Sequence, residues 1–358
     1  MKYIKILIIS LFITLITGCY NYRELNDLGI TTAVGISKDG DNYNLVIEVL
    51  KTETSSNEEN KIETILYESS GKTIQEALRR AILKSPKRLY ANHLYMILID
   101  EELAKDGIAS IMDLFFRDVE SRKQFYVLIS KDDIKKVLET TDEITAKSLV
   151  ERLKVNDDYL SNTTPITFSK LLTKYANPNI EMVIPSVKLN DKEIVIDDTA
   201  IFKGDKLIGY IDEHESLYYS LIMNNVSDTV LTSLYKNEYT TIEINNTNTS
   251  INVLNNTFKI KIDLSGYIAE INSKVDLTNP EIIKEIEDTF EEDLKSRISK
   301  FIQKVIDKYD TDIFGFKDLM YKKDFKNYKD FNFKKLNFDI NIDILLKYKG
   351  NGVKELNA

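Results

Sequence analysis

An apolar run near the start of the chain differs in pattern from every later segment. Lys2 and Lys5 precede residues 6–16, nine of which are apolar. As a helix, this run of eleven residues spans about 16 Å, roughly half of a 30 Å hydrocarbon layer. A positive start followed by a short apolar run is typical of a secretory signal peptide. The pattern therefore predicts a cleaved leader over residues 1–18 and argues against a transmembrane helix.

Strand and helix patterns alternate between residues 28 and 175. Two strands are expected over 28–51, joined by the turn dipeptide Asp39-Gly40, and the polar run 52–61 is predicted to be a surface loop. Thr73 and Glu76 have the spacing of a capping box at the start of a helix. The alternation predicts a mixed α/β region. Its other expected elements are strands over 90–99 and 125–130 and helices over 101–117, 132–139, 145–155 and 165–175.

The pattern changes near Pro178 and Pro185. From about residue 182 the sequence predicts short strands, and a short helix is expected over 214–223. Three segments rich in turn-forming residues separate the expected strands. They are Asn190-Asp191, Lys203-Gly204-Asp205 and the Asn/Thr-rich run 245–250.

One long helix stands out in the C-terminal half. It is predicted to begin at Asn279-Pro280 and to continue to about Tyr309, with apolar residues at three- and four-residue spacing. Strands 258–264 and 336–348 alternate apolar with polar residues, and we expect them to pair beneath this helix. The C-terminal domain is thus predicted to be an antiparallel sheet with one long helix, and the whole chain to be α+β (mixed α/β).

Charge is distributed unevenly along the predicted long helix. Its first half is acidic and its second half is basic, an order that complements the helix dipole at both ends. The basic half is compatible with a binding surface, but a solvated helix face is the favoured interpretation. The basic residues are Lys295, Arg297, Lys300, Lys304 and Lys308.

Composition excludes several classes of function. The chain has 358 residues, of which 43% are hydrophobic and 29% charged, so it is long enough for two or three domains. Its 48 basic and 57 acidic residues give a net charge of −9, the wrong sign for binding nucleic acid along a broad surface. One cysteine and two histidines exclude an internal disulfide, a cysteine-bound metal and a three-histidine metal site. We therefore predict no nucleic-acid partner and no cofactor.

Candidate catalytic or metal-binding residues are few. Gly71-Lys72-Thr73 matches the end of a phosphate loop, but Leu66 stands where that motif needs glycine, so a helix cap is favoured. His93 lies in an expected apolar strand, where a core histidine is favoured, and His214 lies among acids at an expected helix start, where a surface role is favoured over proton sensing. We predict no catalytic residue. Three further acids lack the loop spacing of a calcium site: Asp310, Asp312 and Asp318.

The only cysteine follows directly after the leader. Leu15-Ile16-Thr17-Gly18-Cys19 resembles a bacterial lipobox, in which the thiol receives a diacylglyceryl group and cleavage falls between Gly18 and Cys19. Two or three acyl chains, palmitate among them, attach a protein stably to a membrane, whereas one chain does not. Loss of Lys2 and Lys5 with the leader changes the net charge from −9 to −11. Residues 19–27 then form a tether of at most about 30 Å.

Short motifs are spread along nearly the whole chain. They are residues 22–28, 70–73, 89–94, 101–104, 117–118, Pro185, 199–203, 206–210 and 312–316. In this order they resemble the Ger(x)C family, the lipoprotein C subunits of spore nutrient-germinant receptors. One departure is that this chain has no tryptophan. Tyr20 or Tyr22 and Tyr328 or Phe331 are expected to replace the tryptophans that the family often carries.

The resemblance implies three small mixed domains in a row. We assign residues 28–188 to the N-terminal domain and 189–358 to the C-terminal region, which divides into a small β-rich middle domain at about 189–226 and the sheet and long helix at about 227–350. The resemblance also implies a place on the outer face of the spore inner membrane and association with two membrane-embedded receptor subunits. The expected function is non-enzymatic: to stabilise or couple those subunits during germination.

Two other classes of function remain open at this point. A lipid-anchored solute-binding protein would capture the nutrient itself, but it normally has two similar α/β lobes, which the strand-rich C-terminal half does not suggest. A surface hydrolase would need a pocket with a carboxylate or histidine of shifted pKa.

Overall fold

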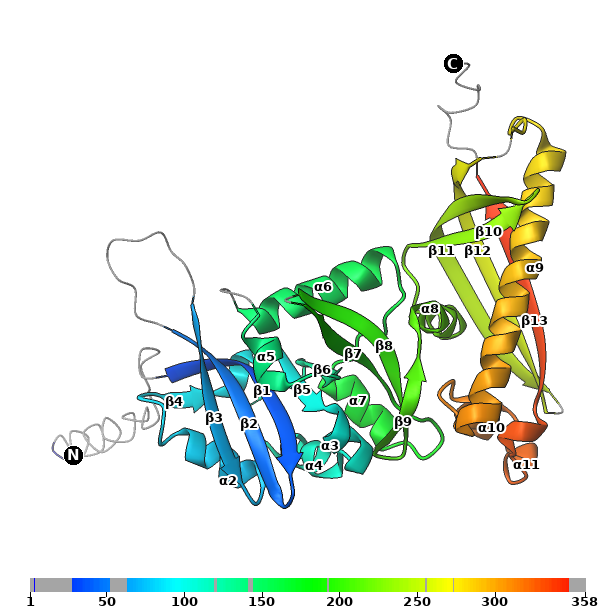
Figure 1. Cartoon of the computed structure of the whole chain (residues 1–358). Coiled ribbons are helices and arrows are strands. Elements are labelled where there is room, and N and C mark those ends of the chain that lie inside the picture. The colour runs from blue at the N-terminus through cyan, green and yellow to red at the C-terminus, as the bar shows by residue number, and fades with distance from the viewer. Residues whose placement is uncertain are drawn as a thin grey trace, which may run out of the picture.

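The computed structural model describes Tyr3 and residues 28–347, except 52–62, 119–120, 141–143, 192, 255 and 273. These residues form one sheet of nine strands and one of four, each packed with helices. The first sheet occupies one end of the molecule, and the second sheet with its long helix occupies the other (Figure 1). The predicted mixed α+β fold is confirmed. The predicted tether, Gly18, Cys19 and the surface loop over 52–61 lie outside the described residues.

The first sheet is parallel in its middle and antiparallel at both ends. Its order is β3-β2-β1-β5-β6-β7-β8-β9, and the short strand β4 also pairs with β1. Strands β1, β5, β6 and β7 run parallel to their neighbours in that series, as expected for strands joined by helices. The strands are β1 (Leu28–Asp39), β2 (Asn42–Leu50), β3 (Thr64–Gly71), β4 (Arg88–Tyr90), β5 (Met96–Asp100), β6 (Tyr126–Ser130), β7 (Val183–Asn190), β8 (Glu193–Lys203) and β9 (Lys206–Ile211).

Helices cover both faces of this sheet. One buried core joins α2, α3, α4 and α7 to one face, and a second joins α5 and α6 to the other. The alternation along β1 shows this directly, because Val34 belongs to the first core and Ala33 to the second. The helices are α2 (Ile74–Ala81), α3 (Glu101–Asp106), α4 (Ala109–Arg117), α5 (Ile134–Leu138), α6 (Thr145–Tyr159) and α7 (Phe168–Tyr175).

Local turn chemistry is confirmed at two positions and corrects one prediction. Gly40 and Gly204 have positive φ angles of 53° and 62° in the β1–β2 and β8–β9 turns, where the sequence predicts turns. The single helix predicted over 101–117 is wrong. The segment forms two helices, α3 and α4, which Gly107 separates. Gly107 has a φ of 130°, a conformation that a residue with a side chain rarely adopts.

The second sheet has the order β10-β11-β12-β13 and packs against α9. Asn279 caps α9 and Pro280 occupies its first turn, as predicted, and the helix ends in a π-helical turn over Val305–Tyr309. The buried stripe of α9 includes Ile286, Phe290 and Leu294. The elements are β10 (Thr229–Tyr235), β11 (Glu238–Leu254), β12 (Thr257–Ile271), α9 (Pro280–Lys304), α10 (Phe316–Lys323), α11 (Phe325–Tyr328) and β13 (Asn337–Leu346).

Two expectations for this half need correction. Strand β13 pairs with β12, as predicted, but it runs parallel to it, because α9 returns the chain to the end of the sheet from which β12 starts. The turn expected over 245–250 is wrong, since these residues continue β11. Within them, Thr249 donates from Oγ1 to the carbonyl of Leu221, at 2.6 Å, and Thr247 donates to that of Val226, at 2.8 Å. These bonds stabilise the extended conformation of the polar run.

The strands predicted as a middle domain form one edge of the first sheet. Strands β8 and β9 extend the first sheet through β7. Helix α8 (Glu213–Ile222), predicted over 214–223, packs with the core of the second half. Two hydrogen bonds tie these parts together: Tyr309 Oη donates to the carbonyl of Tyr210, at 2.6 Å, and the Glu181 amide donates to that of Asp312, at 2.9 Å.

Candidate functional site

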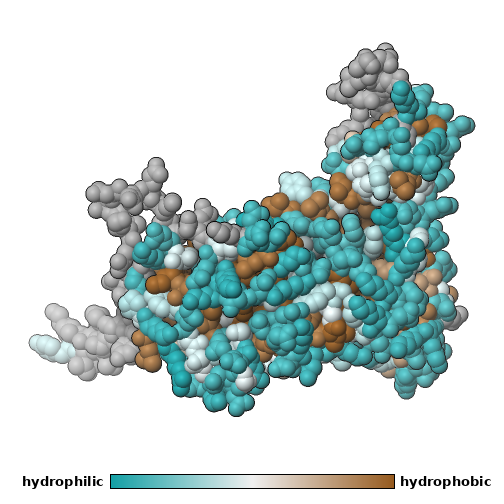
Figure 2. Space-filling view, viewed as in Figure 1, coloured by the Kyte–Doolittle hydropathy of each residue, from teal (hydrophilic) through white to brown (hydrophobic). Residues whose placement is uncertain are grey.

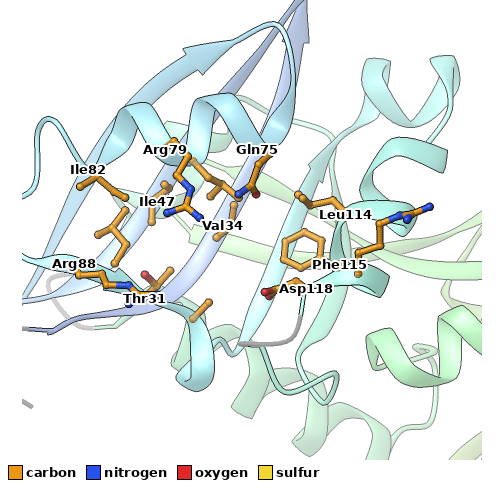
Figure 3. A pocket seen from close by; sticks show the side chains of 14 residues that line it. Thr31, Val34, Ile47, Gln75, Arg79, Ile82, Arg88, Leu114, Phe115 and Asp118 are labelled. Carbon is orange, nitrogen blue, oxygen red and sulfur yellow. The ribbon is translucent and has the colours of Figure 1, made fainter. Parts of the chain in front are cut away.

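A groove of about 430 Å³ opens between α2, α4 and the face of the first sheet. Val34 and Ile47 from β1 and β2 form its floor, with Leu78 from α2 and Phe115 from α4 at its sides. Three arginines lie along it, and Figure 3 shows the side chain of Arg79 reaching from α2 toward Ile47 and Val34. The groove therefore combines an apolar floor with a cationic rim.

Hydrogen bonds at the start of α2 fix where this helix begins and thereby where Arg79 lies on the groove rim. Thr73 Oγ1 accepts from the amide of Glu76, at 3.1 Å, and Glu76 Oε2 accepts from that of Lys72, at 2.8 Å. These bonds confirm that Gly71-Lys72-Thr73 leads into a helix cap. Ala77 and Ala81 of α2 are fully buried against the sheet, so Arg79 lies on the outer side.

The arginines of the groove differ in their partners. Arg117 Nε donates to Asp113 Oδ1, at 2.8 Å, one turn earlier on α4. Arg88 belongs to β4, where it pairs with Leu28 of β1. Arg79 has no ion-pair partner among the described residues. Three of the chain's eight arginines thus line one groove, which fits an amphiphilic ligand with an anionic group.

A second hollow, of about 870 Å³, is more polar and more open. It lies near the carboxyl ends of β1 and β5, a position where α/β sheets commonly bind ligands. Ser37, Asp100, Asp133 and Lys135 are among its lining residues. Burial raises the pKa of Asp100, although this side chain already caps α3 by accepting from the amide of Leu103.

A partly buried ion-pair cluster joins β6, β8 and β9 of the first sheet to α3. Lys131 Nζ lies 2.6 Å from Asp197 Oδ2 and 2.7 Å from Asp198 Oδ2, and 4.1 Å from the centre of the Tyr210 ring. Tyr210 Oη donates to Glu101 Oε1, at 2.8 Å. Burial and this bond raise the pKa of Tyr210. Although burial alone would raise the pKa of Asp197, bonds from Lys131 and Lys188 lower it. The cluster is satisfied internally and has a structural role.

Glu48 is a second buried charge that local sequence patterns did not indicate. Its side chain accepts from Thr32 Oγ1, at 2.6 Å, and from the amides of Thr145 and Ala146, at 2.8 and 3.3 Å. Burial raises the pKa of Glu48, and the bond from Thr32 opposes this rise. Glu48 in β2 therefore caps the start of α6 from 97 residues away.

The histidines that the sequence analysis considered lie on the surface. His93 is exposed in a 3₁₀ turn over Ala91–His93, so its placement in the core of a strand is wrong. The chain bends away from the sheet between β4 and β5. His214 is exposed in the first turn of α8, as predicted. Neither lines the groove.

The three candidate aspartates have separate partners. Asp312 accepts from the amides of Phe316 and Lys317, at 3.2 and 2.7 Å, and so caps α10. Burial raises the pKa of Asp312 to about 6, with the hydrogen bonds from these amides acting in the opposite direction. Asp318 accepts from Asn177, at 3.0 Å, and Asp310 lies 3.6 Å from Lys203. Within the described residues, no group of three possible ligands could hold a metal ion.

The basic half of the long helix is partly engaged. Lys304 Nζ lies 2.6 Å from Glu215 Oε1 on α8, and Arg297 lies 2.7 Å from Asp293. Lys295 and Lys300 are exposed, as expected for a solvated helix face.

Two family models match the chain in succession. The model described as "Spore germination protein N-terminal domain" matches residues 21–189, and the model "Spore germination B3/ GerAC like, C-terminal" matches residues 197–350. Together they account for nearly the whole length over which the sequence resembles the Ger(x)C family.

Similar proteins agree with these matches. Spore germination protein KC of Bacillus subtilis (strain 168) is 25% identical over 90% of this chain and 88% of its own. Spore germination protein YndF of the same organism is 24% identical over 96% of both chains. The crystal structure of the GerBC protein superposes with a TM-score of 0.61 at 20% identity, covering 88% of this chain and 97% of GerBC, which shows a shared fold. The chain is therefore a member of the Ger(x)C family, the C subunits of spore germination receptors.

Proposed function

We propose that this protein is a lipid-anchored, non-enzymatic subunit of a nutrient-germinant receptor on the outer face of the spore inner membrane. In this role it stabilises or couples the two membrane-embedded subunits. The observation that carries the proposal is the lipobox-like sequence ending at Cys19, directly before a body that the two family models match from residue 21. The cleaved leader 1–18, the tether 19–27 and the division near residue 189 are parts of the same proposal.

The described body supports attachment through lipid. None of its helices is long and apolar enough to cross a membrane. On the face shown in Figure 2, hydrophilic residues dominate and apolar residues form small separate patches. Such a surface fits a body that stays in water beside the membrane.

The described charges support a non-enzymatic role. Three carboxyl groups with raised pKa, those of Glu48, Asp100 and Asp312, accept hydrogen bonds from helix amides. The exposed histidines lie outside the groove. These groups stabilise the fold. In a hydrolase, by contrast, the catalytic carboxyl groups would face a substrate.

Changing Cys19 to Ala tests the proposal. The variant should lose membrane retention and should impair nutrient-triggered germination, whereas Ser10→Ala, a change inside the leader, should alter neither. Mass spectrometry of the native protein should find a diacylglyceryl-modified Cys19 as the first residue. Retention of the Cys19 variant with a normal response would contradict the proposed anchor.

The polar hollow favours one second candidate, direct capture of the nutrient. Its position at the carboxyl ends of β1 and β5 and its mixed charges fit a small zwitterion. Calorimetric titration with amino acids and sugars separates the two functions. Tight stoichiometric binding that Asp133→Asn abolishes would favour capture, and absence of binding would favour coupling.

A further inference from the structure

The segment that leaves α2 is unusual in charge for so acidic a chain. Residues 77–99 contain five basic residues and no aspartate or glutamate, although the whole chain has a net charge of −9. All five fall within residues 79–88, which we call the α2–β4 edge. They are Arg79, Arg80, Lys84, Lys87 and Arg88.

This edge also presents an apolar side chain to solvent. Leu83 is 87% exposed, more than any other large hydrophobic side chain of residues 28–347 that the structure describes. It lies just after α2, next to Lys84, and Ile82 beside it is 37% exposed. A protruding leucine among cations is the combination found where peripheral proteins touch membranes.

The edge lies beside the point where the tether enters the fold. Strand β4 pairs in parallel with the first residues of β1, and Arg88 stands opposite Leu28. Leu28 is nine residues after Cys19, a distance that an extended chain spans in at most about 30 Å. Anchoring at Cys19 therefore keeps this edge within reach of the bilayer.

Two of these five cations, Arg79 and Lys84, are not compensated by a neighbouring acid that the structure describes. Arg80 pairs with Glu76, at 2.6 Å, one turn earlier on α2. Arg79 and Lys84 have no ion-pair partner among the described residues. Acidic residues elsewhere on the body act weakly here, because salt screens charges beyond about 10 Å. Arg79 and Lys84 thus leave positive charge available on this edge although the protein as a whole is acidic.

We propose that the α2–β4 edge contacts an anionic phospholipid surface, with Leu83 entering the boundary between headgroups and acyl chains. The inference rests on the proposed lipid anchor and adds an orientation to it. Arg79, which also lines the groove, offers a planar fork to a lipid phosphate. A flat array of anionic headgroups suits this edge, because exposed cations flank one protruding apolar side chain, Leu83, in the sequence.

The absence of tryptophan from the chain provides a direct test. Leu83→Trp places a unique fluorophore at the edge, and Leu254→Trp places one at a 64% exposed leucine of β11, in the second sheet at the other end of the molecule (Figure 1). Both full-length proteins, purified in lipidated form, are reconstituted into vesicles of phosphatidylcholine with or without phosphatidylglycerol. With phosphatidylglycerol, Trp emission of the Leu83 variant should shift to shorter wavelength and be quenched by lipids brominated on the acyl chain. The Leu254 variant should show neither change.

Charge variants complete the test. Arg79→Gln with Lys84→Gln should reduce the emission shift of the Leu83→Trp protein, and high salt should do the same. Lys295→Gln with Lys300→Gln, which removes equal charge from exposed positions of α9, should not. Equal emission in both vesicle types, or burial of the fluorophore only when the membrane-embedded subunits are present, would overturn the inference.

The outcome is distinguishable from failure of the anchor. If the proposed function holds, both Trp variants float with both vesicle types through their acyl chains. Flotation with a water-exposed fluorophore at position 83 overturns only the lipid contact. Loss of flotation together with an unmodified Cys19 overturns the anchor itself.

Discussion

The α2–β4 edge and the ion-pair cluster around Lys131 use positive charge in opposite ways. Lys131 is held by two aspartates and lies over the Tyr210 ring, with its side chain 21% exposed. Arg79 and Lys84 are exposed and have no ion-pair partner among the described residues. Charge that is neutralised inside the protein fixes how β6, β8 and α3 fit together, whereas surplus charge on the surface remains available for an external partner.

The difference provides a way to assign roles to the charged residues of this protein. A charged group whose hydrogen bonds are all made within the fold contributes to stability, and removing its partner should lower the free energy of unfolding. A charged group on the surface without partners should leave stability nearly unchanged and alter binding. Variants of both kinds can test this distinction.

The largest effect on stability should come from the aromatic core beside the junction of the two halves. Phe316 is buried, and its ring centre lies 4.7 Å from that of Phe258 and 5.2 Å from that of Phe338. Phe316→Ala should lower the free energy of unfolding by about 3–5 kcal/mol, measured by urea unfolding followed by circular dichroism. Phe116→Ala, at a 61% exposed position of α4, should change it by less than about 0.5 kcal/mol. Similar losses for the two would contradict the assignment of the core.

Titration of Asp312 should give the next largest effect. Because its pKa is raised from 3.8 to about 6 in the fold, the folded protein binds this proton more tightly than the unfolded chain does. The contribution to stability is complete below about pH 4 and is lost as pH rises through about 6, a change of about 3 kcal/mol. Asp312→Asn removes this titration, so the difference in unfolding free energy between wild type and variant should move by about that amount between about pH 3 and pH 7. A constant difference would show that Asp312 does not titrate in this range.

Breaking the ion-pair cluster should have a smaller effect. Lys131→Met retains most of the side-chain volume but leaves Asp198 without its ammonium partner. This change should lower the free energy of unfolding by about 1–3 kcal/mol. Lys147→Met removes an exposed pair with Glu151, 3.7 Å away on α6, and should cost less than about 0.5 kcal/mol. Urea unfolding of both variants compares a partly buried pair with an exposed one. Equal losses of unfolding free energy in the two variants would contradict the distinction between the partly buried ion pair and the exposed one.

The smallest change in stability is expected at the α2–β4 edge. Arg79→Gln with Lys84→Gln should shift the free energy of unfolding by less than about 0.5 kcal/mol, because neither side chain has an ion-pair partner among the described residues. The same variant should weaken contact with anionic vesicles. A large loss of stability would assign these residues to the fold and remove the contrast with Lys131.

The elements that local chemistry determines were predictable from sequence. Asn279-Pro280 begins α9, Gly40 and Gly204 make tight turns, and Thr73 caps α2. Each depends on residues adjacent in the chain, so the pattern alone is sufficient.

The remaining features depend on partners far apart in the chain. Glu48 meets the start of α6 across 97 residues, and Lys131 meets Asp197 across 66. The polar run 245–250 is extended because it bonds to the end of α8, and nothing within the run indicates this. Arg79 and Arg88 of the groove rim lie in a run without acids, but Arg117 does not. Only the fold brings these three side chains to one groove.

The place of β1 in the first sheet has a mechanical consequence. The strand that follows the proposed membrane anchor is not at an edge, since β2 flanks it on one side and β4 and β5 on the other. A pull from the bilayer at residue 28 is directed along this interior strand, so the hydrogen bonds on both sides resist it together in shear and do not open one by one. Force applied at the membrane therefore reaches the centre of the protein before any peripheral element can yield.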